Sequence, residues 1–336
     1  MIKQATLKDV AKVCGVSSMT VSNVLNGRDK EVGAKTRERI LYAIAELGYR
    51  QNLAAKRLRA QKTSSIGMLI LDDVSDFLND PFIAQVVSGL SNHATEKGYN
   101  LILQGLRSDM AMSSSLLGNL RTDGLCATLS GTSDQRRAFK ERLATLGIPV
   151  VLIQEEFDHP LVCGIRQDDY TAAAEIAEYL VAKGARNLHY LSPSAQWPAI
   201  KERIAGTTKV CEAVGGSVKV IDCGDEGFKA TQSAVSNSIG LHGLPDVFVG
   251  GNDRMAMATL RLLIDRGIRI PEDVCVTGFN SFDFVAFAQP KLLTAQSPAH
   301  EMGRLAGVEL VKAMESGEFQ DRAISLPITI VRGQSA

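Results

Sequence analysis

The apolar residues near the start of the chain recur at helical spacing in two short runs. The first run places them at i, i+3, i+4 and i+7, at Leu7, Val10, Ala11 and Cys14. This spacing predicts a helix with one buried face. Gly15 interrupts the pattern, and a second run on one side of a helix follows at Val21, Val24 and Leu25. Ser17 is a favourable N-cap for the second helix, so we predict two helices joined by a tight turn, the helix-turn-helix arrangement.

A third helix is predicted over residues 34–47, and a polar linker then reaches to about residue 64. From there on, apolar runs alternate with amphipathic segments of helical period. We expect strands at 66–71, 101–105, 124–130, 149–153, 188–192, 218–223, 246–251 and 274–279. We expect helices at 81–97, 113–121, 134–146, 170–183, 199–214, 228–239 and 253–266. Such alternation is typical of parallel sheets with helices on both faces, and the rhythm restarts near residues 163–170, so we predict two doubly wound subdomains.

Charge is distributed unevenly between the helical start and the rest of the chain. The whole chain of 336 residues carries 37 basic and 37 acidic side chains. Residues 1–60 hold 12 Lys and Arg against 5 Asp and Glu, a net charge of +7, which leaves 25 against 32, or −7, for residues 61–336. A basic head with a helix-turn-helix pattern indicates a nucleic-acid partner, and the alternative is a solvated basic surface without a partner.

Several classes of protein are disfavoured by what the sequence lacks. No apolar stretch is long enough to span a membrane and the first residues have no apolar signal-peptide core, so we expect a cytoplasmic protein without a membrane partner. The Cys and His residues show no ligand spacing, so we predict no metal and no cofactor. The motifs GxGxxG, GxxxxGK(S/T) and GxSxG are missing, which argues against an enzyme. Asp168 and Asp169 are interpreted as loop-end and surface residues rather than as general acids or bases.

Eight segments, in order along the chain, resemble successive motifs of the LacI/GalR family of bacterial repressors. They are TLKDVAKVCGVSSMTVSNVLNG, TRERILYAIAELGY, YRQNLAAKRL, NDPFIAQVVSGL, KERIAG, GGNDRMAMATL, RIPEDVCVTGFN and HEMGRLAG. The resemblance covers nearly the whole chain. It implies an all-α helix-turn-helix head and an α/β core, similar to periplasmic sugar-binding proteins, of two doubly wound parallel-sheet subdomains.

The resemblance also implies where the domains begin and end. We expect a DNA-binding headpiece over residues 1–50, a hinge helix and linker over 51–63, and an effector-binding and dimerisation core over 64–336. Within the core, the first subdomain is expected at about 64–165 and 291–325, and the second at about 166–290 and 326–336.

Members of this family are homodimers that couple a small metabolite to operator affinity. The resemblance therefore implies a ligand-responsive transcriptional repressor, not an enzyme, that binds a palindromic DNA operator as a homodimer. Two alternatives use the same core fold. A periplasmic sugar-binding protein would have no basic head, and a sugar-processing enzyme would turn over the sugar that it binds.

DNA contacts are implied on the second helix of the head and on the hinge helix. Three base-reading positions of the family fall at Ser18, Met19 and Asn23. Asparagine can bond to adenine N6 and N7, and methionine can contact a thymine methyl, the alternative for Met19 being packing on its own headpiece. Side chains suited to phosphate contacts are Thr6, Ser17, Thr20, Ser22 and Asn26. The hinge helix over 52–59 adds Asn52 and a minor-groove wedge at Leu58, for which the alternative is docking on the core.

An effector site is implied in the core. Phe82 matches an aromatic wall, Arg203 a ligand-gripping arginine and Asn252 a polar contact of the family. Trp197 is the only tryptophan and stands where some members contact their ligand. We expect it to stack on a sugar face, and the alternative is a place in the ordinary hydrophobic core.

Asn280 is the position at which this chain leaves the family pattern. The family commonly has Asp in GFD, which accepts hydrogen bonds from sugar hydroxyls and pairs with the arginine, whereas this chain has GFN. The missing negative charge predicts a more positive cleft near Arg203. Gluconate-responsive members also lack this Asp and share the MTVS of residues 19–22 and the Ser-Pro of residues 297–298. We therefore expect a sugar acid or a sugar phosphate as effector, with a neutral sugar as the alternative.

Overall fold

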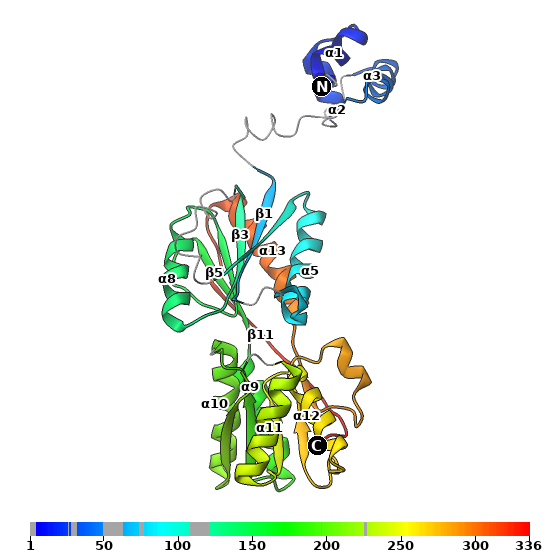
Figure 1. Cartoon of the computed structure of the whole chain (residues 1–336). Coiled ribbons are helices and arrows are strands. Elements are labelled where there is room, and N and C mark those ends of the chain that lie inside the picture. Colours follow the sequence, from blue (N-terminus) through cyan, green and yellow to red (C-terminus); the bar gives the residue numbers. More distant parts are fainter. Residues whose placement is uncertain are drawn as a thin grey trace. The chain divides into compact units, whose positions relative to one another are not determined.

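The computed structural model describes residues 5–25, 27, 32–49, 63–73, 77–107, 121–195, 197–224 and 227–336. The chain forms two compact units, residues 1–63 and residues 64–336, which we call the head and the core. Figure 1 shows both units and labels many of their helices and some of their strands. The predictions for Asn26, Asn52 and Leu58, and for nearly all of the helix at 113–121, lie outside the described residues.

In the part of the head that the structure describes, three helices pack around a small apolar cluster. Their bounds are Leu7–Val13 for α1, Ser18–Leu25 for α2 and Ala34–Glu46 for α3. Val10, Val21 and Ile40, one from each helix, are fully buried, as the apolar periodicity predicts. Gly15 has a φ of +57°, which glycine adopts without strain, and this conformation permits the tight turn between α1 and α2. The predicted helix-turn-helix arrangement is confirmed.

The first half of the core is a six-stranded sheet whose strands are all parallel. In spatial order the strands are β11 (Ala323–Leu326), β5 (Val162–Gln167), β4 (Val150–Ile153), β3 (Gly124–Leu129), β1 (Ser65–Leu71) and β2 (Asn100–Leu106). On one face pack α5 (Pro81–Glu96) and α13 (Ala299–Ser316), and on the other packs α8 (Ser133–Ala144) (Figure 1). The strands β1, β3 and β4 are buried along their whole length, which explains their continuous apolar sequences. A Cβ atom at Gly89 or Gly303 would overlap the backbone of the facing helix, so these glycines let α5 and α13 approach closely.

The second half of the core repeats this layered plan around a smaller parallel sheet. In spatial order its strands are β7 (Ser217–Asp222), β6 (Asn187–Ser192), β8 (Val247–Gly250) and β9 (Cys275–Thr277). On one face pack α9 (Asp169–Ala182) and α10 (Pro198–Ala213), and on the other pack α11 (Phe228–His242) and α12 (Asp253–Asp265). Each half therefore has helices on both faces of its sheet, and the predicted pair of doubly wound subdomains is confirmed.

The chain crosses between the two halves at residues 167–169, 296–299 and 326–329. The sequence periodicity does not predict the elements around the last two crossings, which are α13, β10 (Thr294–Gln296), β11 and β12 (Thr329–Val331). Leu293 and Ala295 pack in the apolar core of the second half, and β10 pairs with β12 in antiparallel fashion. The chain therefore returns to the first half after Gln296, a few residues later than the expected boundary at about 291.

Candidate functional site

One face of α2 in the head presents small polar side chains together with one long apolar side chain. Met19 is 69% exposed and takes no part in the buried cluster of the head, so the alternative that it packs on the headpiece is disfavoured. Ser18 and Ser22 follow each other by one helical turn, as do Met19 and Asn23. A helix with short side chains and an exposed apolar tip can approach base edges closely.

The first turns of the head helices use two of the predicted phosphate-binding residues as caps. The Ser17 hydroxyl accepts a hydrogen bond from the Thr20 backbone N–H at 3.1 Å. The Thr6 hydroxyl accepts from the Asp9 N–H at 3.3 Å, and the Asp9 carboxylate accepts from the Thr6 N–H at 2.8 Å. This reciprocal capping box fixes the start of α1. Both hydroxyl residues remain exposed.

In the core, the predicted effector residues lie in segments that follow the carboxyl ends of parallel strands. Phe82 begins α5 after β1, Trp197 precedes α10 after β6, Asn252 follows β8, and Asn280 follows β9. The strand order reverses at β1/β3 in the first sheet and at β6/β8 in the second. In open α/β sheets, ligands bind outside the carboxyl ends of the strands at such points.

Arg203 is buried on α10 and is held by three polar groups. Its Nε donates to Asp169 Oδ1 at 2.7 Å, its Nη1 donates to the Gly251 carbonyl at 2.6 Å, and its Nη2 donates to Asn280 Oδ1 at 3.4 Å. The guanidinium also lies 3.8 Å from the centre of the Phe279 ring. The contact to Asn280 is the longest of the three hydrogen bonds, so the Nη2 group is the one that a ligand oxygen can take over at the smallest cost.

Two sequence interpretations are corrected by these contacts. Asp169 is not a surface residue, because its side chain is 1% exposed and it faces Arg203 from the first turn of α9. The missing Asp at position 280 does not leave Arg203 without a carboxylate, because Asp169 supplies one from a segment 34 residues away. The expected excess of positive charge near Arg203 is therefore compensated within the protein.

The loop that carries Asn280 has an unusual backbone conformation, and Asp253 holds it through hydrogen bonds. Asn280 has a φ of 107°, its N–H donates to the Ala295 carbonyl at 2.7 Å, and its own carbonyl accepts from the Ser297 N–H at 3.0 Å. Asp253 accepts hydrogen bonds from the Phe282 N–H at 3.0 Å and from the Thr294 hydroxyl at 2.6 Å. Burial of Asp253 raises the pKa of its carboxyl group to about 7.

The remaining predicted residues make other contacts. Asn252 is the N-cap of α12, and its side chain accepts from the Met255 N–H at 3.0 Å. Phe82 is partly buried and packs against the apolar core of the first half. Trp197 is half-buried, and its indole Nε1 donates across to the Ser130 hydroxyl of the first half at 3.1 Å.

The site therefore contains two carboxylates that the sequence reasoning missed, Asp169 and Asp253. Asp253 stands directly after Asn252, at the first helical position after a strand, and this placement is a usable signal. Asp169 has the equivalent place at the start of α9, but its distance in sequence from Arg203 hides the pairing.

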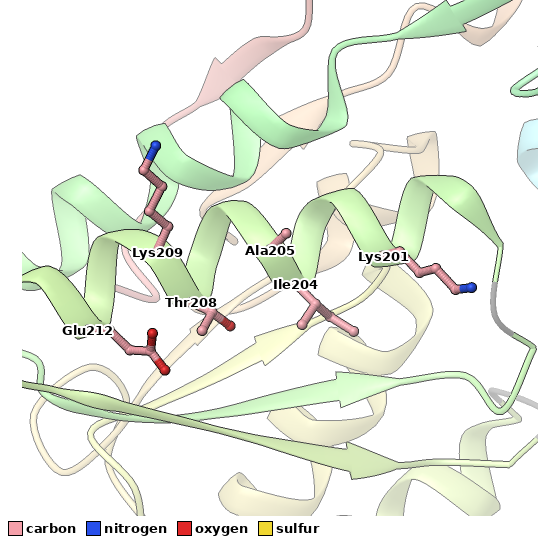
Figure 2. Close-up of a pocket in the computed structure, with 6 residues that line it drawn as sticks. All are labelled: Lys201, Ile204, Ala205, Thr208, Lys209 and Glu212. Carbon is pink, nitrogen blue, oxygen red and sulfur yellow. The ribbon is translucent and has the colours of Figure 1, made fainter.

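A hollow on α10 lies away from these residues. It has a volume of about 560 Å³, and Figure 2 shows the side chains along its wall: Lys201, Ile204, Ala205, Thr208, Lys209 and Glu212. Their spacing places them on one helical face, whereas Ile200, Arg203 and Thr207 lie on the buried face. A small hollow of about 10 Å³, lined in part by Arg203, Tyr190 and Phe279, has room for no more than about one water molecule.

The described part of the chain lacks two further kinds of feature, a membrane-spanning helix and a metal site. No helix there is both long and apolar enough to cross a membrane. Within the same ranges, no group of three or more His, Cys, Asp or Glu residues could hold a metal ion.

A small helical head with a partly exposed polar helix, joined in one chain to a two-part α/β core with a buried arginine near the strand ends, is the arrangement expected of a DNA-binding regulator with a ligand-sensing core. Comparison with known proteins agrees. Residues 6–52 match the bacterial regulatory proteins of the lacI family, and residues 177–336 match the periplasmic binding protein-like domain. The chain is thus similar to the lacI family of bacterial regulatory proteins over residues 6–52 and to periplasmic binding protein-like domains over residues 177–336.

Similar proteins cover nearly the whole chain. The HTH-type transcriptional repressor PurR of Photobacterium profundum is 27% identical, covering 98% of both chains. The ribose operon repressor of Escherichia coli is 28% identical, covering 98% of this chain and 100% of that protein. The crystal structure of the lac repressor dimer bound to operator and the anti-inducer ONPF has the same fold, with a TM-score of 0.86, 23% identity and 99% coverage of both chains. A complex of the transcriptional regulator CelR with cellobiose has a TM-score of 0.72 and 25% identity, covering 99% of this chain and 100% of that chain.

Proposed function

We propose that this protein is a repressor that binds a palindromic operator as a homodimer in the cytoplasm, and that a small polyhydroxylated ligand at Arg203 changes its affinity for the operator. The observation that carries the proposal is the pairing of two sites in one chain: a partly exposed polar face of α2 with an exposed Met19, and a buried arginine near the strand ends of the core. Each site alone fits several functions. Together they fit a regulator and give no support for catalysis.

For the DNA site, α2 is proposed as the helix that enters the major groove. Asn23 is the best-suited base reader, because its amide can bond to adenine N6 and N7, and Met19 offers apolar contact. Base contacts from Ser18 and phosphate contacts from Thr6, Ser17, Thr20, Ser22 and Asn26 complete the proposed surface. Asn52 and Leu58 remain proposed minor-groove contacts of the hinge segment.

Selection of bound sequences from random duplex DNA tests the operator proposal. We expect two inverted half-sites, because a twofold protein dimer matches a twofold operator, and a complex that contains two protein chains. High-affinity binding of a single chain to one half-site would contradict the proposal.

For the ligand site, a sugar acid or sugar phosphate is the first candidate, because the chain resembles gluconate-responsive regulators at Asn280 and at residues 19–22, and Arg203 is its proposed partner. Asn280 supports this choice because its amide adds no negative charge beside the guanidinium. Phe82, Trp197 and Asn252 are proposed as walls and polar contacts around the ligand. A neutral sugar is the second candidate, and the ion pair between Arg203 and Asp169 favours it, because the pair as a whole carries no net charge.

A thermal-shift screen of sugars and sugar acids finds the effector, because a ligand at 100 times its Kd stabilises the folded chain by about 2.7 kcal/mol. Calorimetry with Asn280→Asp then separates the two candidates. The new carboxylate should weaken binding of an acidic effector by like-charge repulsion and leave binding of the matching neutral sugar unchanged or stronger. Stronger binding of the natural effector by Asn280→Asp would exclude the acid and leave the neutral sugar.

A further inference from the structure

Five buried residues of the core form a closed ring of hydrogen bonds around the hinge between the two halves. Asp169 accepts from Arg203 Nε at 2.7 Å and from Gln167 Nε2 at 3.0 Å. The Ser297 hydroxyl donates to Gln167 Oε1 at 2.6 Å, and the Ser297 N–H donates to the Asn280 carbonyl at 3.0 Å. The Asn280 side chain accepts from Arg203 Nη2 at 3.4 Å and closes the ring. We call these five residues the buried ring.

The members of the buried ring come from both sides of the hinge. Gln167 is the last residue of β5 in the first half, and Asp169 is the first residue of α9 in the second. Ser297 lies in the second crossing, between β10 and α13. The third crossing is tied to the same point, because the Asp168 N–H donates to the Leu326 carbonyl at 2.9 Å. All three connections between the halves therefore meet at or beside the ring.

Gln154, a residue of the first half, also binds Asp169. Gln154, at the end of β4, donates from Nε2 to Asp169 Oδ2 at 3.0 Å and accepts the Gln167 N–H on its Oε1 at 3.0 Å. Gln154 has a φ of 60°, a conformation that costs a residue with a Cβ atom free energy. Asp169 is thus bound to one residue of the ligand site and to two residues of the first half.

Because the side chains of the buried ring are shielded from water, a change in one of its hydrogen bonds affects the others. Its side chains are between 1% and 8% exposed, so a hydrogen bond that one member gives up is not replaced by bulk water. A shift of Arg203 toward a ligand must move Asp169 with it or leave a buried carboxylate without its cation, and the second outcome is costly. Movement of Asp169 in turn displaces Gln167 and Ser297, which lie in the crossings.

We propose that Asp169 is the positioning residue of Arg203, and that Asp169, Gln167 and Ser297 carry a change at the ligand site to the hinge between the two halves of the core. The proposal rests on the proposed function in one respect, that Arg203 holds the ligand. Hinge residues at element ends are where domain closure absorbs backbone rotation, and here they share hydrogen bonds with the ligand site. Through the buried ring, a small ligand would thus change how the two halves of the core are positioned relative to each other.

A double-mutant cycle in the full chain, without any ligand, tests this relay. Arg203→Lys keeps the charge but changes the geometry at one side of the ring, and Ser297→Ala removes the hydroxyl at the other side. Arg203 and Ser297 share no direct hydrogen bond. If the two sites are independent, the change in the unfolding equilibrium constant of the double variant should equal the product of the changes in the two single variants, within about twofold. A relay should make the double variant depart from the product of the single effects by at least about threefold.

Ser335→Ala provides the matched control. Its hydroxyl is also buried in the core, where it accepts from the Leu293 N–H at 2.9 Å and donates to the Val276 carbonyl at 2.6 Å, outside the buried ring. When Ser335→Ala is combined with Arg203→Lys, the change in the unfolding equilibrium constant should equal the product of the two single changes within about twofold. If Ser297→Ala does not fold, Ser297→Cys, which keeps most of the side-chain volume, takes its place in the cycle.

Trp197 supplies a readout that a purely local packing role would not move. It is the only tryptophan, it precedes Arg203 by six residues, and its indole is bonded to Ser130 of the opposite half. Ser297→Ala should shift its emission to longer wavelengths and raise its quenching by acrylamide, whereas Ser335→Ala should change neither. Multiplicative effects of Arg203→Lys and Ser297→Ala, or an unchanged Trp197 signal in Ser297→Ala, would overturn the relay. Both measurements need no effector, so a negative effector screen counts against the proposed function alone.

Discussion

The two candidate sites of this chain are built in opposite ways. In the head, Met19 is 69% exposed on a single short helix, and none of the buried residues of that unit belongs to the proposed base-reading set. In the core, Arg203 is 5% exposed and is held by residues from three other segments. A surface that contacts a macromolecule must be exposed, whereas a site for a small ligand excludes water and therefore needs internal partners for its polar groups.

This difference predicts how stability and recognition are related in each unit. In the head, the residues proposed to read bases are separate from the buried cluster that holds the three helices together. In the core, the residues proposed to bind the ligand are also part of the buried polar structure. Substitutions at the base-reading positions of the head should therefore change recognition alone, while substitutions at the core site should change both recognition and stability.

The largest effect is expected where a buried ion pair of the core is broken. Arg203→Ala leaves Asp169 buried without its cation, which should lower the free energy of unfolding by about 3–5 kcal/mol and abolish the ligand response. As a control, Arg261→Ala removes an exposed arginine whose Nε lies 2.9 Å from Asp265 Oδ2, and it should cost no more than about 1 kcal/mol. Urea unfolding of both variants makes the comparison. Equal losses of unfolding free energy in Arg203→Ala and Arg261→Ala would contradict the special importance of the buried ion pair.

A nearly equal effect is expected in the buried cluster of the head. Ile40 is fully buried, so Ile40→Ala should destabilise the head by about 2–5 kcal/mol and weaken operator binding. Leu41 is the next residue on the same helix and is 47% exposed, so Leu41→Ala should change stability by no more than about 0.5 kcal/mol. Calorimetry should show the loss in the transition of the head. A loss in the transition of the core would contradict the independence of the two units.

A pH-dependent effect is expected from Asp253. Its pKa of about 7 lies above the ordinary value of 3.8, because burial disfavours the charged form. The folded chain therefore keeps this proton while the unfolded chain releases it, so the stability contributed by the protonated group is complete below pH 3.8 and is lost as the pH rises to about 7. The slope is at most about 1.4 kcal/mol for each pH unit.

Unfolding experiments between pH 4 and pH 8 measure this slope, which Asp253→Asn should reduce. Asp265→Asn, half-exposed at the other end of α12, is the control and should leave the slope as in the wild type. An identical slope in the wild type and Asp253→Asn would show that the carboxyl group keeps its ordinary pKa.

The smallest effect on stability is expected at α2, the helix proposed to contact DNA. Met19→Ala should change the free energy of unfolding by no more than about 0.5 kcal/mol, yet it should reduce the preference for one operator base pair, worth about 1–3 kcal/mol. Met255→Ala, a fully buried methionine on α12, should instead cost about 2–5 kcal/mol of stability and leave the base preference intact. Competition binding with single-base operator variants reports the preference.

The features that the sequence predicts are those that local spacing determines. The three head helices follow from apolar periodicity and capping at Ser17, and the strands β1, β3 and β4 follow from continuous apolar runs. The return elements were harder to predict, because β10, β11 and β12 are three or four residues long and obtain their partners from distant parts of the chain. A strand of that length has too few positions to show a period.

The same contrast between local spacing and distant partners applies to the two candidate sites. The side chains proposed to read bases lie within one helix, so their spacing alone places them on a common face. The partner of Arg203 could not be predicted in this way, because Asp169 reaches it only through the crossing after β5 and the packing of α9 against α10. Gln167 and Ser297 are 130 positions apart and meet only at the hinge.

The measurement that most directly tests the division between the two units is operator binding by the whole chain and by a chain that begins at Ser64. The whole chain should bind the selected operator with an affinity whose logarithm falls linearly with the logarithm of salt concentration, because the basic head releases counterions from the phosphates. The shortened chain, which keeps the complete core, should show no operator binding at any salt concentration while it still binds the effector. Retention of operator affinity by the chain that begins at Ser64 would contradict the assignment of DNA recognition to the head.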